Sequence, residues 1–292
     1  MKTALRILTL CVLLLFAVAA LAQMANDYLD IYQVQVKPEK RAEFDALAKK
    51  IAEANRTGGD HWEALETMYG DGNVVTYISQ RKSYGDIAKG SDAFMAAMKK
   101  AFGPATDKAF YDFGSYTTWS RGELRVRRWD LSVNAGSNDA ERSKIIGQTR
   151  YLRTTVIQVR PGRAADFESM IRTWKAAHDK SGNGQVFFVS QSLAGQSGTV
   201  YYVTTLKPSL AAFDGLKSMR EIMGDEDYDK WQKSAAEVID HTSVVINRFV
   251  PEFSNVTTEI ASAAPDFWTP KPMMPMKKGA KTVAAKEKEP KK

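Results

Sequence analysis

The chain has 292 residues, a net charge of +7, one cysteine and three histidines. This length suits about two ordinary domains. The charge is uneven: residues 1–22 contribute +2 and residues 255–292 contribute +4, which leaves +1 for residues 23–254. A nearly neutral body argues against a nucleic-acid-binding face. Because the only cysteine is Cys11, the chain beyond it can form neither a disulfide nor a thiolate metal site.

The N-terminus has the features of a secretory signal peptide. Lys2 and Arg6 precede an apolar run from Ile7 to Ala19, and Ala20-Leu21-Ala22 forms a small-x-small cleavage site. A membrane anchor is the alternative, but the run falls short of about 20 residues. The sequence therefore predicts a signal peptide over 1–22 and an exported protein, periplasmic or secreted.

Residues 28–44 recur as residues 151–167, and seven of the 17 positions are identical. Each copy opens with a run of strand-forming residues and reaches a proline two positions later. Apolar residues then follow at helical spacing from Phe44 and from Phe167. Two matching segments with the same change of period predict a duplicated domain.

In chain order, the first half predicts strands over 28–36, 61–69, 74–80 and 124–131. Its helices are expected after Phe44, over 84–102 and through Phe113, and Gly70 to Asn73 forms a turn. The second half predicts strands from 151 and over 185–192, 199–206 and 243–250, with helices from 164 and over 210–223 and 225–240. Each half thus has the order βαββαβ, which is the ferredoxin-like pattern.

The predicted fold class is α+β: two tandem ferredoxin-like repeats that form an intramolecular dimeric α+β barrel. The predicted domains are 23–133 and 148–254, joined by a polar linker over 134–147. Residues 255–292 are rich in proline and lysine, and we expect a disordered basic tail there. Such a tail suits contact with anionic envelope surfaces. Because the halves can cover each other's sheets, we expect a monomeric pseudo-dimer.

The stretches V-K-P-x-K-x-x-x-F from Val36 and V-R-P-G-R-x-x-x-F from Val159 carry a family resemblance. They resemble the first strand and helix of the dimeric α+β barrel superfamily, in particular its antibiotic-biosynthesis-monooxygenase-like and NIPSNAP-like members. The resemblance implies a ligand pocket between sheet and helices. It also implies a range of activities, from cofactor-free monooxygenases to haem-degrading enzymes and haem-binding chlorite-dismutase-like proteins.

Asn55 and His178 occupy equivalent positions at the ends of the two repeated helices. A polar group there either caps the helix or faces the mouth of a pocket. A neutral histidine can exchange a proton with a phenolic ligand, so His178 is the catalytic candidate. The resemblance also makes it the candidate for a proximal haem ligand.

Four further residues are candidates for ligand binding. His61 and Trp62 open a strand, where they form either an exposed histidine beside a core tryptophan or an aromatic wall with a proton-transfer group. Gln35 and Gln158 are matched strand amides that need partners if their face is buried. The three histidines, His61, His178 and His241, have no metal-ligand spacing, so no metal site is predicted. His241 follows a predicted helix, where a cation suits the helix dipole.

The predicted function is an exported protein that binds a small apolar or aromatic molecule without a cofactor. One alternative is an oxidoreductase, either cofactor-free or haem-dependent. The other is a non-catalytic module that interacts with the envelope through its tail. Fold resemblance alone supports the enzyme alternative, so the sequence leaves catalysis open.

Overall fold

The computed structural model describes residues 27–269. The predicted signal peptide over 1–22 and the part of the predicted tail over 270–292 lie outside the described residues. The eight strands are β1 (Tyr28–Val36), β2 (Glu63–Tyr69), β3 (Val74–Arg81), β4 (Thr117–Arg127), β5 (Tyr151–Val159), β6 (Phe187–Ala194), β7 (Thr199–Lys207) and β8 (Ile239–Phe249).

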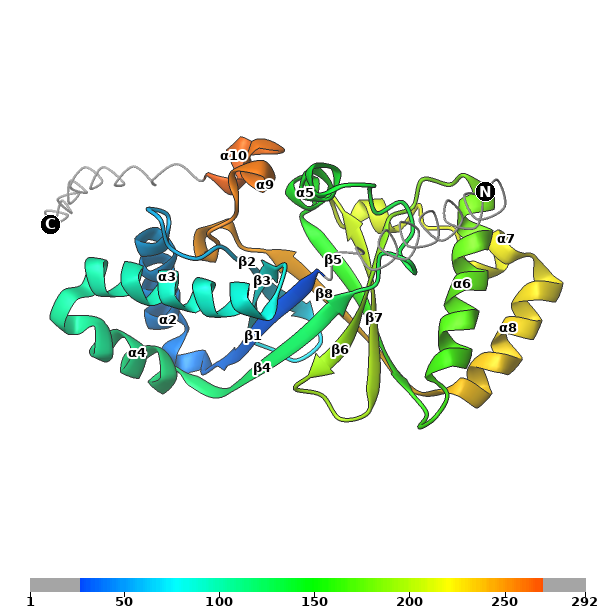
Figure 1. Cartoon of the computed structure of the whole chain (residues 1–292), viewed down its shortest axis with the longest axis horizontal. Helices are drawn as coiled ribbons and strands as arrows, with labels where there is room; N and C mark the ends of the chain where they lie inside the picture. Colours follow the sequence, from blue (N-terminus) through cyan, green and yellow to red (C-terminus); the bar gives the residue numbers. More distant parts are fainter. Residues whose placement is uncertain (1–26, 270–292) are drawn as a thin grey trace, which may run out of the picture.

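The helices gather in two groups, one for each half. The first half has α2 (Arg41–Asn55), α3 (Tyr84–Phe102) and α4 (Thr106–Ser115), and the second has α6 (Ala164–Ser181), α7 (Met219–Met223) and α8 (Asp225–Val238). In Figure 1 these groups lie on opposite sides of the strands. Three further helices, α5 (Asp139–Gln148), α9 (Thr258–Ser262) and α10 (Pro265–Trp268), belong to neither group. Short 3-10 turns occupy Pro38–Lys40, Gly103–Ala105, Ala211–Phe213 and Pro251–Phe253.

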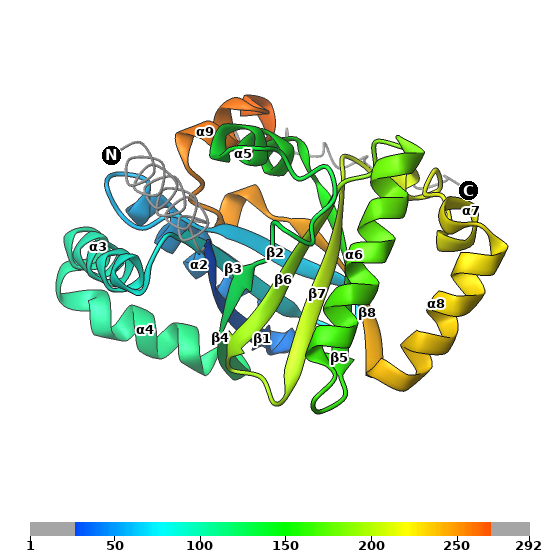
Figure 2. The same cartoon turned by 45° about the vertical axis from the view of Figure 1, so that its right-hand side comes forward.

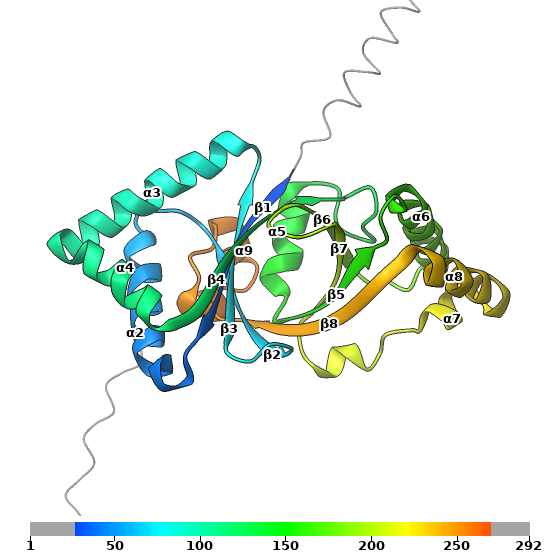
Figure 3. The same cartoon turned by 90° about the horizontal axis from the view of Figure 1, so that it is seen from below.

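The strands form one closed antiparallel barrel in the order β1-β3-β2-β8-β5-β7-β6-β4. Within each half the order is that of a ferredoxin-like sheet, β4-β1-β3-β2 and β8-β5-β7-β6. The halves join where β2 pairs with β8 and β4 pairs with β6. The predicted intramolecular α+β barrel is therefore confirmed, and Figure 3 shows the strands between the two helix groups.

Alternation along each strand gives the barrel an inner face and an outer face. The outer face of each half packs on its own helices. In the first half Val34, Val75 and Phe44 are fully buried in this layer, and in the second half Val189, Phe167 and Tyr201 are. The inner face includes both apolar and charged side chains. Each half thus has its own sheet–helix core, and the halves share the barrel interior.

Two segments fold where the sequence predicted a linker and a disordered tail. Residues 139–148 form α5, and residues 258–268 form α9 and α10. They pack on each other at one end of the barrel, as Figure 2 shows. Ile260 and Trp268 are buried there, and the Trp268 Nε1 donates to the Gly147 carbonyl at 2.8 Å. The sequence did not predict these contacts, because both segments are polar or proline-rich overall and only a few apolar residues in them make the contacts.

Three other boundaries differ from the sequence prediction. The last strand of the first half spans 117–127, whereas the sequence predicted 124–131. The prediction was wrong because the inward-facing residues of this strand are polar, so its apolar periodicity is weak. The helix predicted over 210–223 is a 3-10 turn at 211–213 followed by the short α7, which begins at a Ser218 capping box. Strand β8 starts at Ile239, where a helix was predicted to continue to 240. No helix within 27–269 is long and apolar enough to cross a membrane.

The close contact between α5 and α9 predicts that a substitution at Gly147 destabilises the protein. A Cβ added at Gly147 would overlap the backbone carbonyl of Ile260 and lie 2.6 Å from the Ala263 Cβ. We expect Gly147→Ala to lower the free energy of unfolding by about 1–3 kcal/mol, because the packed segment cannot absorb the methyl group without moving. Denaturant unfolding measures the change.

Gly114→Ala is the matched control, because a Cβ at this helical glycine meets no atom within 4 Å. It should be neutral or stabilise the protein by up to about 1 kcal/mol. Equal effects of the two substitutions would contradict the packing of α9 on α5.

Candidate functional site

Each half encloses a cavity between its sheet and its helices. The first-half cavity has a volume of about 480 Å³ and lies between the outer face of β1 and β3 and helices α2, α3 and α4. Its wall is mainly aromatic: Tyr32, Trp62, Tyr77, Phe94, Phe110 and Phe113. The Tyr77 hydroxyl is buried and has no hydrogen-bond partner among the described residues, and burial raises its pKa. It is therefore a protonated donor beside an aromatic cavity.

The second-half cavity is larger, at about 560 Å³, and lies between the outer face of β5 to β8 and helices α6, α7 and α8. Its wall includes the rings of Trp174, His178, Phe187, Phe213 and Trp231. Two polar atoms of wall residues, Gln185 Oε1 and Trp231 Nε1, are buried without a partner among the described residues. Such orphaned atoms are rare in folded proteins, and they often mark a place where a ligand or water completes the bonding.

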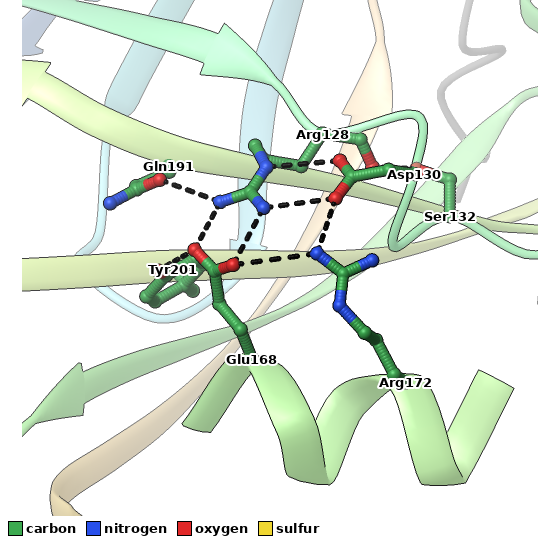
Figure 4. A network of polar contacts seen from close by, with 7 residues as sticks. All are labelled: Arg128, Asp130, Ser132, Glu168, Arg172, Gln191 and Tyr201. Carbon is green, nitrogen blue, oxygen red and sulfur yellow. Dashed lines mark hydrogen bonds and ion pairs between the residues drawn. The ribbon is translucent and has the colours of Figure 1, made fainter. Parts of the chain in front are cut away.

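A network of ion pairs fixes α6, which supplies Trp174 and His178 to this wall. Arg128, just after β4, pairs with Asp130 and with Glu168 of α6, and it also donates to Gln191 of β6 at 3.0 Å. The Tyr201 hydroxyl donates to Glu168 at 2.8 Å. Figure 4 shows how these groups tie the helix to two strands and to the inter-repeat segment. The hydrogen bond from Arg128 holds the pKa of Glu168 below its usual range, so the network stays charged at neutral pH.

His178 is part of the cavity wall, and 2% of its surface is exposed. Its ring packs edge-on against Trp174 and Phe187, with centroids at 4.7 and 4.9 Å, and its Nδ1 lies 3.3 Å from the Asn183 amide nitrogen. Burial lowers the pKa of His178, so the ring is neutral at pH 7. A neutral ring does not stabilise a helix terminus by charge. The predicted site role of His178 stays a prediction.

Asn55, the counterpart of His178, lies in a different setting. Its side chain donates to the Ile51 carbonyl at 3.0 Å and accepts from the Asp60 amide at 3.2 Å. Asn255 donates to the Asn55 carbonyl at 3.0 Å, so the segment before α9 closes the end of α2. Asn55 lines none of the four cavities described in this section. Its geometry is that of a helix-end cap.

The two predicted strand amides also lie outside these cavities. Gln35 donates to the Gly72 carbonyl at 3.2 Å and accepts from the Thr118 hydroxyl at 2.8 Å, so hairpin and strand neighbours satisfy its amide. Gln158 occupies the matching position on β5. Both lie near turns at the end of the barrel opposite α5 and α9. The structure therefore does not bring them to the sheet–helix cavities.

His61 and Trp62 line a third cavity, of about 470 Å³, at the end of the barrel covered by α5 and α9. We call it the mouth cavity; Trp62 also contributes to the first-half cavity. A narrower cavity of about 130 Å³ continues inside the barrel and shares Leu29, Glu63, Gln80 and Arg127 with the mouth. Sequence reasoning missed Glu63 and Arg127, because the cavities that they line form only when the strands close the barrel.

No protein-family model and no curated protein matches this chain. Solved structures with a similar fold include a provisionally named monooxygenase from Fusobacterium nucleatum, with 11% identity, a TM-score of 0.49, and 78% of this chain and 94% of that one covered. They also include an anthrone oxidase-like protein, with 14% identity, a TM-score of 0.47, and coverage of 78% and 93%.

A heme-binding protein from Thermus thermophilus has 9% identity and a TM-score of 0.44, with coverage of 79% and 93%. Likenesses at TM-scores below 0.5 say nothing about activity. The barrel assignment rests on the strand order of this chain, which closes two ferredoxin-like sheets into one barrel within one polypeptide.

The second-half cavity does not fit a haem as its side chains stand. A histidine that ligates haem iron must present a ring nitrogen to the haem slot, so part of its ring should border open space. His178 has 2% of its surface exposed, and Trp174 and Phe187 flank its ring. Within residues 27–269 no group of three or more His, Cys, Asp or Glu side chains is arranged to hold a metal ion.

Glu63 yields a prediction about stability and pH. It faces the barrel interior with 6% of its surface exposed, and its Oε1 accepts from the Gln80 amide at 2.9 Å. Burial raises its pKa to about 7. The protonated form therefore stabilises the fold fully below about pH 4.5, and this contribution is lost as pH rises through 7.

We expect Glu63→Gln to raise the free energy of unfolding at pH 8 by about 1–3 kcal/mol, because it removes a buried charge and keeps the shape. The gain should shrink toward pH 5. Denaturant melts of both proteins from pH 5 to pH 8 measure it, and a gain that is the same at every pH would contradict the raised pKa.

Proposed function

We propose that the protein is an exported small-molecule-binding protein whose principal ligand occupies the second-half cavity. The carrying observation is that this cavity of about 560 Å³ combines aromatic walls with two orphaned polar atoms, the Trp231 Nε1 donor and the Gln185 Oε1 acceptor. Ligand pockets of this size usually join apolar surface to a few convergent polar groups. The groups in the cavity wall therefore indicate which chemical groups a matching ligand would have.

The wall favours an aromatic ligand that has both a hydrogen-bond acceptor and a hydroxyl. The acceptor would take the Trp231 N–H, and the hydroxyl would donate to Gln185 Oε1. The rings of Trp174, Phe187 and Trp231 supply flat apolar contact. His178 is neutral and lies in the same wall. A phenol or a phenolic ketone is the ligand class that uses every one of these groups.

The first-half cavity offers less to such a ligand. Its orphaned polar atoms are the Tyr77 hydroxyl and the Arg81 Nε donor. Tyr77 stands on β3 where the matching residue of β7 is Val203. Among the described residues it has no orphaned carbonyl oxygen, whereas the second-half cavity has Gln185 Oε1. We therefore assign the principal site to the second half. Export and the monomeric state belong to the same proposal, and they rest on the signal-peptide pattern and on the barrel closing within one chain.

Binding of 1-naphthol, which has two fused rings and one hydroxyl, tests the site. We expect Trp231→Phe to weaken 1-naphthol binding about threefold to tenfold at pH 7, because it removes the N–H donor and replaces the indole by a smaller aromatic ring. Isothermal titration calorimetry gives the affinities. Native mass spectrometry of the purified protein identifies any natural ligand that co-purifies.

Tyr77→Phe is the matched control in the other half, because it also removes one orphaned donor and keeps the ring. It should leave 1-naphthol affinity unchanged. A loss in Tyr77→Phe with none in Trp231→Phe would move the site to the first half and overturn the assignment.

Export has its own test, because the leader pattern predicts cleavage after Ala22. N-terminal sequencing of the protein from the envelope fraction of its own cells should begin at Gln23. A chain that still begins at Met1, or that remains in the cytosol, would contradict export without bearing on the binding site.

A further inference from the structure

The mouth cavity differs chemically from the sheet–helix cavities. Its floor is formed by the inner face of four strands of the first half, with Leu29, Glu63, Gln80 and Arg127 shared with the narrow interior cavity. Helices α5 and α9 cover it, as Figure 2 shows. The matching region of the second half is filled instead by an apolar cluster that includes Phe188, Leu206, Phe249 and Trp268. The barrel end is therefore open over one half only.

Arg127 is the unusual group of this cavity. Its arginine neighbours each have a carboxylate: Arg81 pairs with Asp60 at 2.6 Å, Arg125 with Glu123 at 2.8 Å, and Arg142 with Asp27 at 3.5 Å. The Arg127 guanidinium has no carboxylate within 4.0 Å and no side-chain hydrogen bond among residues 27–269. Its contacts are the rings of Trp129 and Phe188, at 5.5 and 5.2 Å from the guanidinium carbon.

Arg127 is half-buried in the mouth cavity, so its guanidinium is open to a ligand that enters there. Burial lowers the pKa of Arg127 to about 10, which leaves it charged at neutral pH. A second donor stands beside it: Arg142 lines the cavity, and its Nε is buried without a partner. The guanidinium of Arg142 lies 4.1 Å above the Trp129 ring, which fixes its plane. Two guanidinium groups with unused donors thus meet one aromatic surface.

We propose that the mouth cavity binds a small aromatic carboxylate, with its carboxylate on Arg127 and its ring beside Trp129 and Phe188. A guanidinium and a carboxylate match in plane and spacing, so this pairing supplies two parallel hydrogen bonds. The cavity of about 470 Å³ has room for one or two rings. A phosphate dianion fits less well, because Glu63 and Asp27 face the same space and would repel the second charge. This site is separate from the proposed phenol site and does not depend on it.

Glu63 makes the binding sensitive to pH. When ionised it repels a bound carboxylate, and when protonated it can donate a hydrogen bond to one. Its pKa of about 7 places the change within the working range, so binding should take up a proton and weaken as pH rises. From pH 6 to pH 8 the protonated fraction falls about tenfold, and the affinity should fall by up to the same factor.

Other charged groups around Glu63 come from every element that packs on the cavity. They are Asp27 before β1, His61 before β2, Arg81 and Lys82 at the end of β3, Arg127 of β4, Asp139 and Arg142 of α5, and Glu259 of α9. Most of these form ion pairs, among them Lys82 with Asp27 and Asp139. His61 also lines the cavity, and its ring Nδ1 lies 3.3 Å from the Asn255 carbonyl oxygen.

The test compares benzoate with benzamide, which has the same shape and no charge, by isothermal titration calorimetry on the full-length protein. Benzoate should bind at pH 6, and benzamide should bind at least about tenfold more weakly. Arg127→Gln should weaken benzoate about tenfold or more, because one charged hydrogen-bonding partner is lost. Arg121→Gln is the matched control. Arg121 lies on the same strand, donates to Gln33 at 2.8 Å, and lines neither the mouth cavity nor the narrow interior cavity. It should leave benzoate binding unchanged.

Glu63→Gln tests the pH dependence that the proposal predicts. It also provides a test of the proposal if Arg127→Gln fails to fold. In Glu63→Gln, benzoate affinity should be the same at pH 6 and pH 8. A pH dependence that persists there would overturn the role of Glu63. Benzoate that binds Arg127→Gln as well as the wild type, that binds no better than benzamide, or that is displaced by 1-naphthol would overturn the site. Failure at the mouth leaves the Trp231 test intact, and the reverse also holds.

Discussion

The pairing of β2 with β8 and of β4 with β6 is the constraint on which the rest of the molecule depends. Each half alone is a four-stranded sheet with two open edges, and open edges expose unpaired amide and carbonyl groups. The tandem repeat pairs every edge within one chain. Side chains reinforce one of the seams: Arg248 of β8 binds Glu66 of β2 at 2.6 Å, and Thr67 donates to Asn247 at 3.0 Å. Closure then forces the inner residues of both halves into a shared interior.

That interior explains why two buried glutamates behave in opposite ways. Burial alone raises the pKa of a carboxyl group. At Glu123 this is outweighed by Arg125 at 2.8 Å, with Tyr202 donating at 2.6 Å and Gln196 at 3.0 Å, so its pKa is lowered. At Glu63 the one side-chain partner is the neutral Gln80 amide, so burial prevails and the pKa rises. The difference arises because Arg125 touches an acid and Arg127, two residues along the same strand, does not.

The sequence predicted the repeat, the βαββαβ order and the closed barrel, because these follow from short-range periodicity written twice. It failed where the deciding contacts join distant segments. The helix over 139–148 has mostly polar residues, and it is held by Ile146 and Gly147 against Ile260 and Trp268, more than 100 positions away. The site residues show the same division. His61, Trp62 and His178 line cavities, whereas Asn55 is held by Asn255, a contact that no local pattern reveals. Gln185, Trp231 and Arg127 were missed because a missing partner cannot be read from a sequence.

Fusing two copies into one chain also allows them to diverge, which a homodimer of identical subunits cannot do. The duplicated positions show this at each cavity. His178 stands where the first copy has Asn55, and Val203 stands where the first copy has Tyr77. The added segments are used only once. The residues before and within α9 close the end of α2 and cover the mouth over the first half, while Trp268 fills the corresponding space over the second. A symmetric barrel would have two equal sheet–helix cavities and an even mouth. This chain has two unequal cavities and a one-sided mouth, so each of these three cavities has a different set of polar groups in its wall.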